Sequence, residues 1–86
     1  MSTRTFTLEV TPNASATRLG LVVSRRVGGA VVRNRVKRCV REWFRIDRAR
    51  MPVAVDLVVI ARTGAGVLGT AALRDELNTL IARAAQ

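Results

Sequence analysis

The sequence predicts a small α+β protein: a two-layer sandwich with elements in the order ββαβα and a small mixed sheet under its helices. Three observations support this fold class. Two short stretches near the start of the chain, and a third in its second half, carry alternating or continuous apolar residues, as β-strands do. Two other segments repeat their apolar residues every three or four positions, as α-helices do. A length of 86 residues, 49% of them hydrophobic, suits one globular domain over residues 1–86.

The first two elements are predicted to be strands. Phe6, Leu8 and Val10 alternate with polar residues, which indicates a half-buried strand at 5–10. Residues 11–17 contain Pro, Asn and Ser and predict a turn, and the second strand follows at 18–24. We expect these two strands to pair in an antiparallel manner across the turn.

The third element is predicted to be a basic helix at about 30–46. Val32, Val36, Val40 and Phe44 recur every four positions, so they form one narrow apolar stripe. Along another edge of the same helix lie Asn34, Arg38, Arg41 and Arg45, with Arg33 and Lys37 beside them. The helix therefore buries a narrow face and exposes a wide cationic one.

Most of the chain's charge lies in this helix and the residues just before it. The formal net charge is +9, and residues 24–45 contain eight Arg or Lys against one acid, Glu42. Neighbouring like charges repel, so such a face is destabilising until a polyanion binds it. Charge alone leaves RNA, DNA and acidic lipid open. We expect no membrane partner, because the apolar stripe is narrow and no apolar run reaches the length of a membrane span.

The last two elements are predicted to be a strand and a helix. Residues 54–61 are almost continuously apolar and β-branched, which is typical of a central strand buried on both faces. The strand–helix–strand order predicts a crossover, with the two strands parallel if they are adjacent. Residues 71–84 repeat leucines on one face and predict the second helix.

Gly64, Gly66 and Gly69 form a G-x-G-x-x-G pattern between this strand and this helix. The pattern allows two interpretations, a dinucleotide-binding fingerprint or a flexible loop. The fingerprint requires a second parallel strand and an acidic residue about 20 positions further on, which this chain does not supply. We therefore favour the flexible loop.

Side chains suited to catalysis are few, since the chain contains no His and no Tyr. Cys39 lies beside the apolar stripe, so we expect buried packing rather than a nucleophile or metal ligand. As the sole cysteine it also suits a reducing cytoplasm. Asp56 begins a buried strand, where a structural role is expected. Asn34 allows two roles, a contact to an RNA base edge or 2′-hydroxyl, or a local backbone cap.

The segment RLGLVVSRRVGGAVVRNRVKRCVREWFR, followed by DLVVIAR, resembles the protein subunit of bacterial ribonuclease P. The most specific part is Arg33-Asn34-Arg35, followed by Lys37-Arg38 and preceded by a Val-Ser-Arg-Arg strand end. The resemblance implies a catalytic RNA subunit and precursor tRNA as partners, with Mg²⁺ held mainly by the RNA and no catalytic side chain in this chain. It also implies an unusual left-handed crossover around the basic helix.

The resemblance also implies a set of binding residues. On the helix and at the strand ends these are Arg25, Arg26, Arg33, Asn34, Arg35, Lys37, Arg38 and Arg62. Arg41 and Arg45 join the expected RNA-binding residues because they lie on the same cationic edge of the helix. Family members usually begin with a further helix and strand, whereas here only Met1–Arg4 precede the matching part. We therefore expect an N-terminally short form, which is a truncated chain, a chain with a misplaced start, or a form with a reduced cleft. Phe6 is the one aromatic left on this side to contact the tRNA leader. Weak self-association through an exposed sheet face is a further hypothesis. The alternative function is a general structured-RNA-binding or ribosome-associated module.

Overall fold

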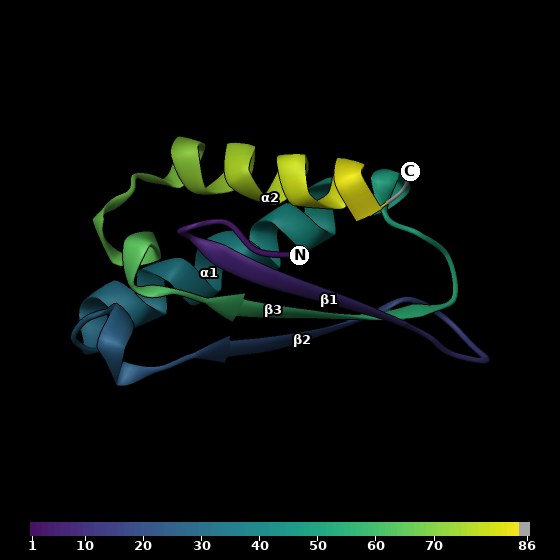
Figure 1. Ribbon diagram of the computed structural model, residues 1–86, viewed down its shortest axis with the longest axis horizontal. Coiled ribbons are helices and arrows are strands. Elements are labelled where there is room, and N and C mark those ends of the chain that lie inside the picture. The colour runs from purple at the N-terminus through teal and green to yellow at the C-terminus, as the bar shows by residue number, and fades with distance from the viewer. Residues whose placement is uncertain (85–86) are drawn as a thin grey trace.

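The computed structural model describes residues 1–84 and contains the five predicted elements in the predicted order (Figure 1). The strands are β1 (Phe6–Pro12), β2 (Arg18–Val23) and β3 (Val55–Ala61), and the helices are α1 (Ala30–Ile46) and α2 (Thr70–Ala84). Three short 3-10 turns connect them: η1 (Arg25–Val27), η2 (Arg48–Arg50) and η3 (Thr63–Val67). The α+β class and the ββαβα order are confirmed.

Strand β3 lies in the middle of the sheet, whose order is β1-β3-β2. It pairs antiparallel with β1, with Phe6 opposite Ala61, and parallel with β2, with Arg18 opposite Asp56. The predicted pairing of the first two strands is therefore wrong, because β3 separates them. The most apolar strand takes the centre, while β1 ends in Pro12, which lacks a backbone donor and suits an edge. The parallel crossover β2–α1–β3 is as predicted, and its hand stays a prediction.

Both helices lie on the same side of the sheet, which gives two layers (Figure 1). The residues of β3 consequently alternate between buried and half-buried, from Val55 to Ala61. The prediction that this strand is buried on both faces is therefore wrong. Its second face carries Asp56, Val58 and Ile60, which the neighbouring strands cover only in part.

The hydrophobic core fills the space between the sheet and the helices. Its largest fully buried side chains are Trp43, Phe6, Leu57, Leu73, Leu77, Leu80, Val36, Val40 and Val59. The indole Nε1 of Trp43 donates a hydrogen bond of 2.8 Å to Oδ1 of Asn78. This bond satisfies the one polar atom of the buried indole and joins α1 to α2.

The glycine-rich segment is an ordered 3-10 turn, η3, and the prediction of a flexible loop there is wrong. Ala65 at its centre is fully buried. A Cβ atom on residue 66 would overlap the carbonyl oxygen of Val27, and one on residue 64 would lie 2.7 Å from the carbonyl oxygen of Arg4. Gly64 and Gly66 therefore allow close backbone packing, whereas a Cβ atom on residue 69 would meet no neighbour within 4 Å.

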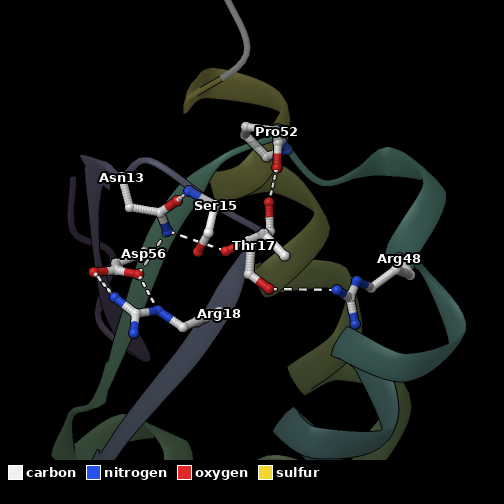
Figure 2. Close-up of polar contacts among 8 residues, drawn as sticks. Asn13, Ser15, Thr17, Arg18, Arg48, Pro52 and Asp56 are labelled. Atoms are coloured by element: carbon white, nitrogen blue, oxygen red, sulfur yellow. Dashed lines mark hydrogen bonds and ion pairs between the residues drawn. The ribbon is translucent and has the colours of Figure 1, made fainter.

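The opposite end of the sheet is held by side chains instead (Figure 2). Arg18 contacts Asp56 at two points, Nε to Oδ1 at 2.8 Å and Nη2 to Oδ2 at 3.0 Å. Asn13 Nδ2 donates to the same Oδ1 at 2.8 Å, and Arg48 Nη2 donates to the carbonyl of Thr17 at 3.3 Å. The hydrogen bonds from Arg18 and Asn13 hold the pKa of the Asp56 carboxyl below its ordinary value. The structural role predicted for Asp56 is confirmed.

Candidate nucleic-acid interface

Helix α1 packs one apolar face against the core. The buried residues of this helix are Val36, Cys39, Val40 and Trp43. Val32 and Phe44, the two ends of the predicted stripe, are only half-buried. A spacing of four residues drifts by about 40° per step around a helix with 3.6 residues per turn, so the stripe leaves the core at both ends. The buried position predicted for Cys39 is confirmed.

The outer edge of α1, defined here as Asn34, Arg38, Arg41 and Arg45, is exposed along its whole length. These four residues and Lys37 line a shallow groove of about 410 Å³ together with Glu42. Glu42 pairs with Arg45 at 2.8 Å, but both side chains are at least half exposed, so this bond is weak. Within the described residues, Lys37, Arg38 and Arg41 have no acidic partner, and the edge keeps most of its positive charge.

Arg35 differs from its neighbours because its guanidinium binds the protein itself. Its Nη1 donates to the carbonyl of Leu68 at 2.6 Å, and its Nη2 donates to the carbonyl of Gly66 at 3.1 Å. Two bonds from one planar group fix the turn η3 against α1. The structure therefore places Arg35 in a clamp between these two elements, a role that the basic pattern of the sequence did not reveal.

Arg33 is also less exposed than the outer edge. The residue is half-buried, and its Nε is buried without a hydrogen-bond partner among the described residues. A buried donor without a partner is destabilising, since it has lost its water and gained no bond. Arg33 thus lies next to the exposed cations, but its side chain is not as open to a partner as theirs.

A second group of cations, the strand-end cluster, consists of Arg25, Arg26 and Arg62. All three are exposed, and they follow the ends of the parallel strands β2 and β3, which meet at the same end of the sheet. Arg62 Nη1 donates to the carbonyl of Thr3 at 2.8 Å, which also ties down the start of the chain. Because η1 leads directly into α1, the fold places this cluster beside the first turn of the basic helix.

Phe6 is the predicted site residue that the structure contradicts. Its side chain is fully buried and belongs to the helix-facing side of the sheet. The alternation of β1 puts Phe6 and Leu8 into the core and Thr7 and Glu9 on the other face. Phe6 therefore cannot stack on a tRNA leader, and its role is core packing.

Cys39 and the acidic side chains are relevant to two kinds of chemistry, nucleophilic attack and metal binding. Burial raises the pKa of the Cys39 thiol, against the opposing charges of Arg74 and Arg35, so the thiol stays protonated and is a poor nucleophile. Within residues 1–84, no three His, Cys, Asp or Glu side chains lie close enough to hold a metal ion. Neither helix in this part of the chain is long and apolar enough to cross a bilayer.

One cation beside α1 was missed by the sequence analysis. Arg74, on the second turn of α2, faces α1, and its Nη2 lies 3.5 Å from Oδ2 of Asp47 at the end of that helix. It lines a groove between the two helices that also contains Asn34 and Arg38. No sequence signal identifies it, because Arg74 is one of two widely spaced cations in an ordinary amphipathic helix.

A cationic helix packed on a small mixed sheet, with basic strand ends beside its first turn, defines a small basic α+β protein suited to a polyanion. The chain belongs to the Ribonuclease P family, whose sequence model matches residues 1–85. This match confirms the resemblance seen in the signature segment.

Individual relatives agree with this assignment. The Ribonuclease P protein component of Desulfovibrio desulfuricans is 48% identical over 71 residues, which are 80% of this chain and 55% of that protein. That of Syntrophus aciditrophicus is 36% identical over 85 residues, 98% of this chain and 71% of that protein. The solved structure of the Staphylococcus aureus RNase P protein superposes with a TM-score of 0.90 at 32% identity, covering 98% of this chain and 78% of that one. The chain thus has the fold of these proteins and spans little more than half the length of the first.

Proposed function

We propose that this chain acts as the protein subunit of ribonuclease P. It binds the catalytic RNA subunit in the cytoplasm and supports endonucleolytic removal of the 5′ leader from precursor tRNA. The observation that carries the proposal is the outer edge of α1 in a chain that belongs to the Ribonuclease P family. Two of its three cations, Arg38 and Arg41, have no acidic partner among the described residues, and the third, Arg45, has only the exposed pair with Glu42.

Binding rests on neutralisation of RNA phosphates and release of their counterions. On α1 and in the strand-end cluster, five cations make no hydrogen bond or ion pair to the described residues: Arg25, Arg26, Lys37, Arg38 and Arg41. All but the half-buried Lys37 are exposed. If each neutralises one phosphate, a plot of log K against log salt concentration has a slope of about −3.5 to −4.5. The planar guanidinium groups also grip phosphate at two points and stack on exposed bases, which suits a structured RNA.

The chemistry of cleavage belongs to the RNA in this proposal. The described residues offer no cluster of ligands for Mg²⁺, so we expect the RNA to hold the ions that the reaction requires. The protein contributes charge: its cationic face lowers the repulsion between the catalytic RNA and its substrate.

The test is cleavage of a precursor tRNA by the catalytic RNA at low magnesium, with and without the protein. We expect the wild-type chain to restore cleavage. The triple variant Lys37→Gln, Arg38→Gln, Arg41→Gln should bind the catalytic RNA about 100-fold more weakly at 0.1 M salt, since it loses three phosphate contacts. It should also fail to restore cleavage at protein concentrations where the wild type succeeds.

The matched control removes three charges elsewhere. Arg4, Arg50 and Arg83 are exposed, and their side chains make no hydrogen bond to the described residues, so their replacement by Gln changes the net charge equally. If both triple variants lose affinity to the same extent, the outer edge is not the binding face. If unrelated structured RNAs compete as well as the catalytic RNA, the chain is a general RNA-binding module instead.

Weak self-association remains part of the proposal. The sheet face away from the helices carries Val22, half exposed, beside Val58 and Ile60. An exposed apolar patch of this kind favours contact with a second copy at high concentration. A monomer by light scattering at every concentration would contradict it.

A further inference from the structure

A groove of about 590 Å³ runs between α1 and the first turns of α2. Val31 and Ile46 lie at its two ends along α1, about 22 Å apart at the rise of an α-helix. Both are exposed, Val31 at 84% and Ile46 at 52%. A single exposed aliphatic side chain is ordinary, but these two border one groove, so a partner seated in that groove can cover them.

The polar side chains of the groove are mostly cationic. Arg38 has no partner among the described residues, while Arg74 is only loosely paired with Asp47, at 3.5 Å. Arg35 also lines the groove, with its guanidinium held by the carbonyls of Gly66 and Leu68. Such a surface attracts a negative group. The two hydrogen bonds of Arg35 hold its side chain in place, so it does not fill the groove.

The same groove offers hydrogen-bonding groups of both kinds. Asn34 supplies an amide donor and acceptor, and Glu42 supplies a carboxylate acceptor. An anionic phosphate joined to a flat base with apolar faces and a polar edge matches all three properties. In an A-form duplex the base faces are stacked and inaccessible, so only an unpaired nucleotide can use the apolar part.

We propose that the groove between α1 and α2 holds one unstacked nucleotide of the RNA partner, its base against Val31 and its phosphate near Arg38 and Arg74. The inference rests on the proposed function and deepens it, because it adds a pocket for one nucleotide, which shares Arg38 with the outer edge, to the phosphate contacts of that edge. The three arginines lining the groove favour this occupant over an apolar helix of another protein, which would bury them without neutralising them.

The test uses RNA hairpins of equal length and charge. One is fully paired, and four others each carry a single unpaired A, G, C or U in the stem. We expect the wild-type protein to bind at least one bulged hairpin about fivefold or more tightly than the paired one, with the same salt slope. Val31→Ala should abolish this preference without changing the salt slope, because it removes apolar contact and no charge.

The chain supplies a matched control in Val67, which is 85% exposed and lies outside the groove. Val67→Ala should keep the preference in full. Equal binding of all hairpins by the wild type, or equal behaviour of Val31→Ala and Val67→Ala, would overturn the inference. A change in the oligomeric state of RNA-free Val31→Ala would also overturn it, in favour of a second copy as occupant. Cleavage of precursor tRNA is measured separately. If the wild-type protein restores cleavage but shows no preference among the hairpins, the groove inference is refuted and the proposed function stands.

Discussion

The two ends of the sheet are built in opposite ways. At the end where β2 and β3 finish, η3 packs its backbone against Val27 and Arg4, and Arg35 holds it to α1. At the other end, the turn at 13–17 is held by exposed side chains, chiefly the pair between Arg18 and Asp56. The backbone at the first end has no space for an added side-chain atom, whereas the second end depends on exposed polar contacts, which water weakens.

This difference matters because the basic surface begins at the tightly packed end of the sheet. The strand-end cluster and the first turn of α1 both start there. A phosphate-binding surface works best when its charges are held in place before RNA arrives, since less ordering is then required on binding. The contrast between the ends therefore predicts that stability and RNA binding are coupled at the first end and independent at the second.

Gly66→Ala should give the largest effect. The added Cβ would overlap the carbonyl oxygen of Val27, so the turn η3 must move. We expect a loss of about 3 kcal/mol in the free energy of unfolding, measured by urea denaturation. Gly20→Ala is the control, because a Cβ there meets Val58 only at 3.6 Å, and it should stay within about 0.5 kcal/mol of wild type.

Arg35→Ala should give the next effect. It removes two charge-assisted hydrogen bonds and leaves the carbonyls of Gly66 and Leu68 without this donor, so we expect a loss of about 2 kcal/mol by the same measurement. Arg38→Ala, three residues along the same helix, should change stability by no more than about 0.5 kcal/mol and should weaken RNA binding instead. If the two variants unfold alike, Arg35 is an ordinary surface cation and the clamp has no energetic role.

The smallest effect is expected at the other end, from Asp56→Asn. The pKa of Asp56 is lowered in the folded protein, mainly by the hydrogen bonds from Arg18 and to a smaller extent by the hydrogen bond from Asn13. The ionised carboxylate therefore adds stability above its unfolded pKa, and this contribution disappears as the pH falls through the lowered folded value. The melting temperature of the variant should be slightly below wild type at pH 7 and equal to it in strong acid. RNA affinity at pH 7 should not change, and a large loss there would contradict the independence of this end.

The sequence predicted the elements well because each depends on local periodicity. Helix 30–46 and the three strands lie within about two residues of their predicted bounds. The strand order could not be predicted in the same way, since the turn at 11–17 fits a hairpin as well as a passage around a central strand. Phe6 shows the same limit: its alternation was correct, but which face meets the helices depends on the whole sheet.

The sequence was enough to predict which surface is cationic, but not what each residue on it contacts. Arg35 and Arg38 are the same residue type on the same helix, yet one binds backbone carbonyls and the other is exposed. The difference arises from where η3 passes over α1, which is a tertiary contact between residues far apart in the chain. Arg74 was missed for the same reason, because only the packing of α2 brings it beside the outer edge.

The central position of β3 has a consequence for folding while the chain is being synthesised on the ribosome. Every ladder of the described sheet includes β3, with Phe6 paired to Ala61 and Arg18 to Asp56. A nascent chain that has not yet exposed β3 can form the local hydrogen bonds of α1 but none of the ladders of the sheet. During that interval the cationic helix has emerged and its apolar face has no sheet to cover it. Synthesis of β3 therefore gives the cationic helix a sheet to pack on, and α2, which follows it in the chain, then completes the core.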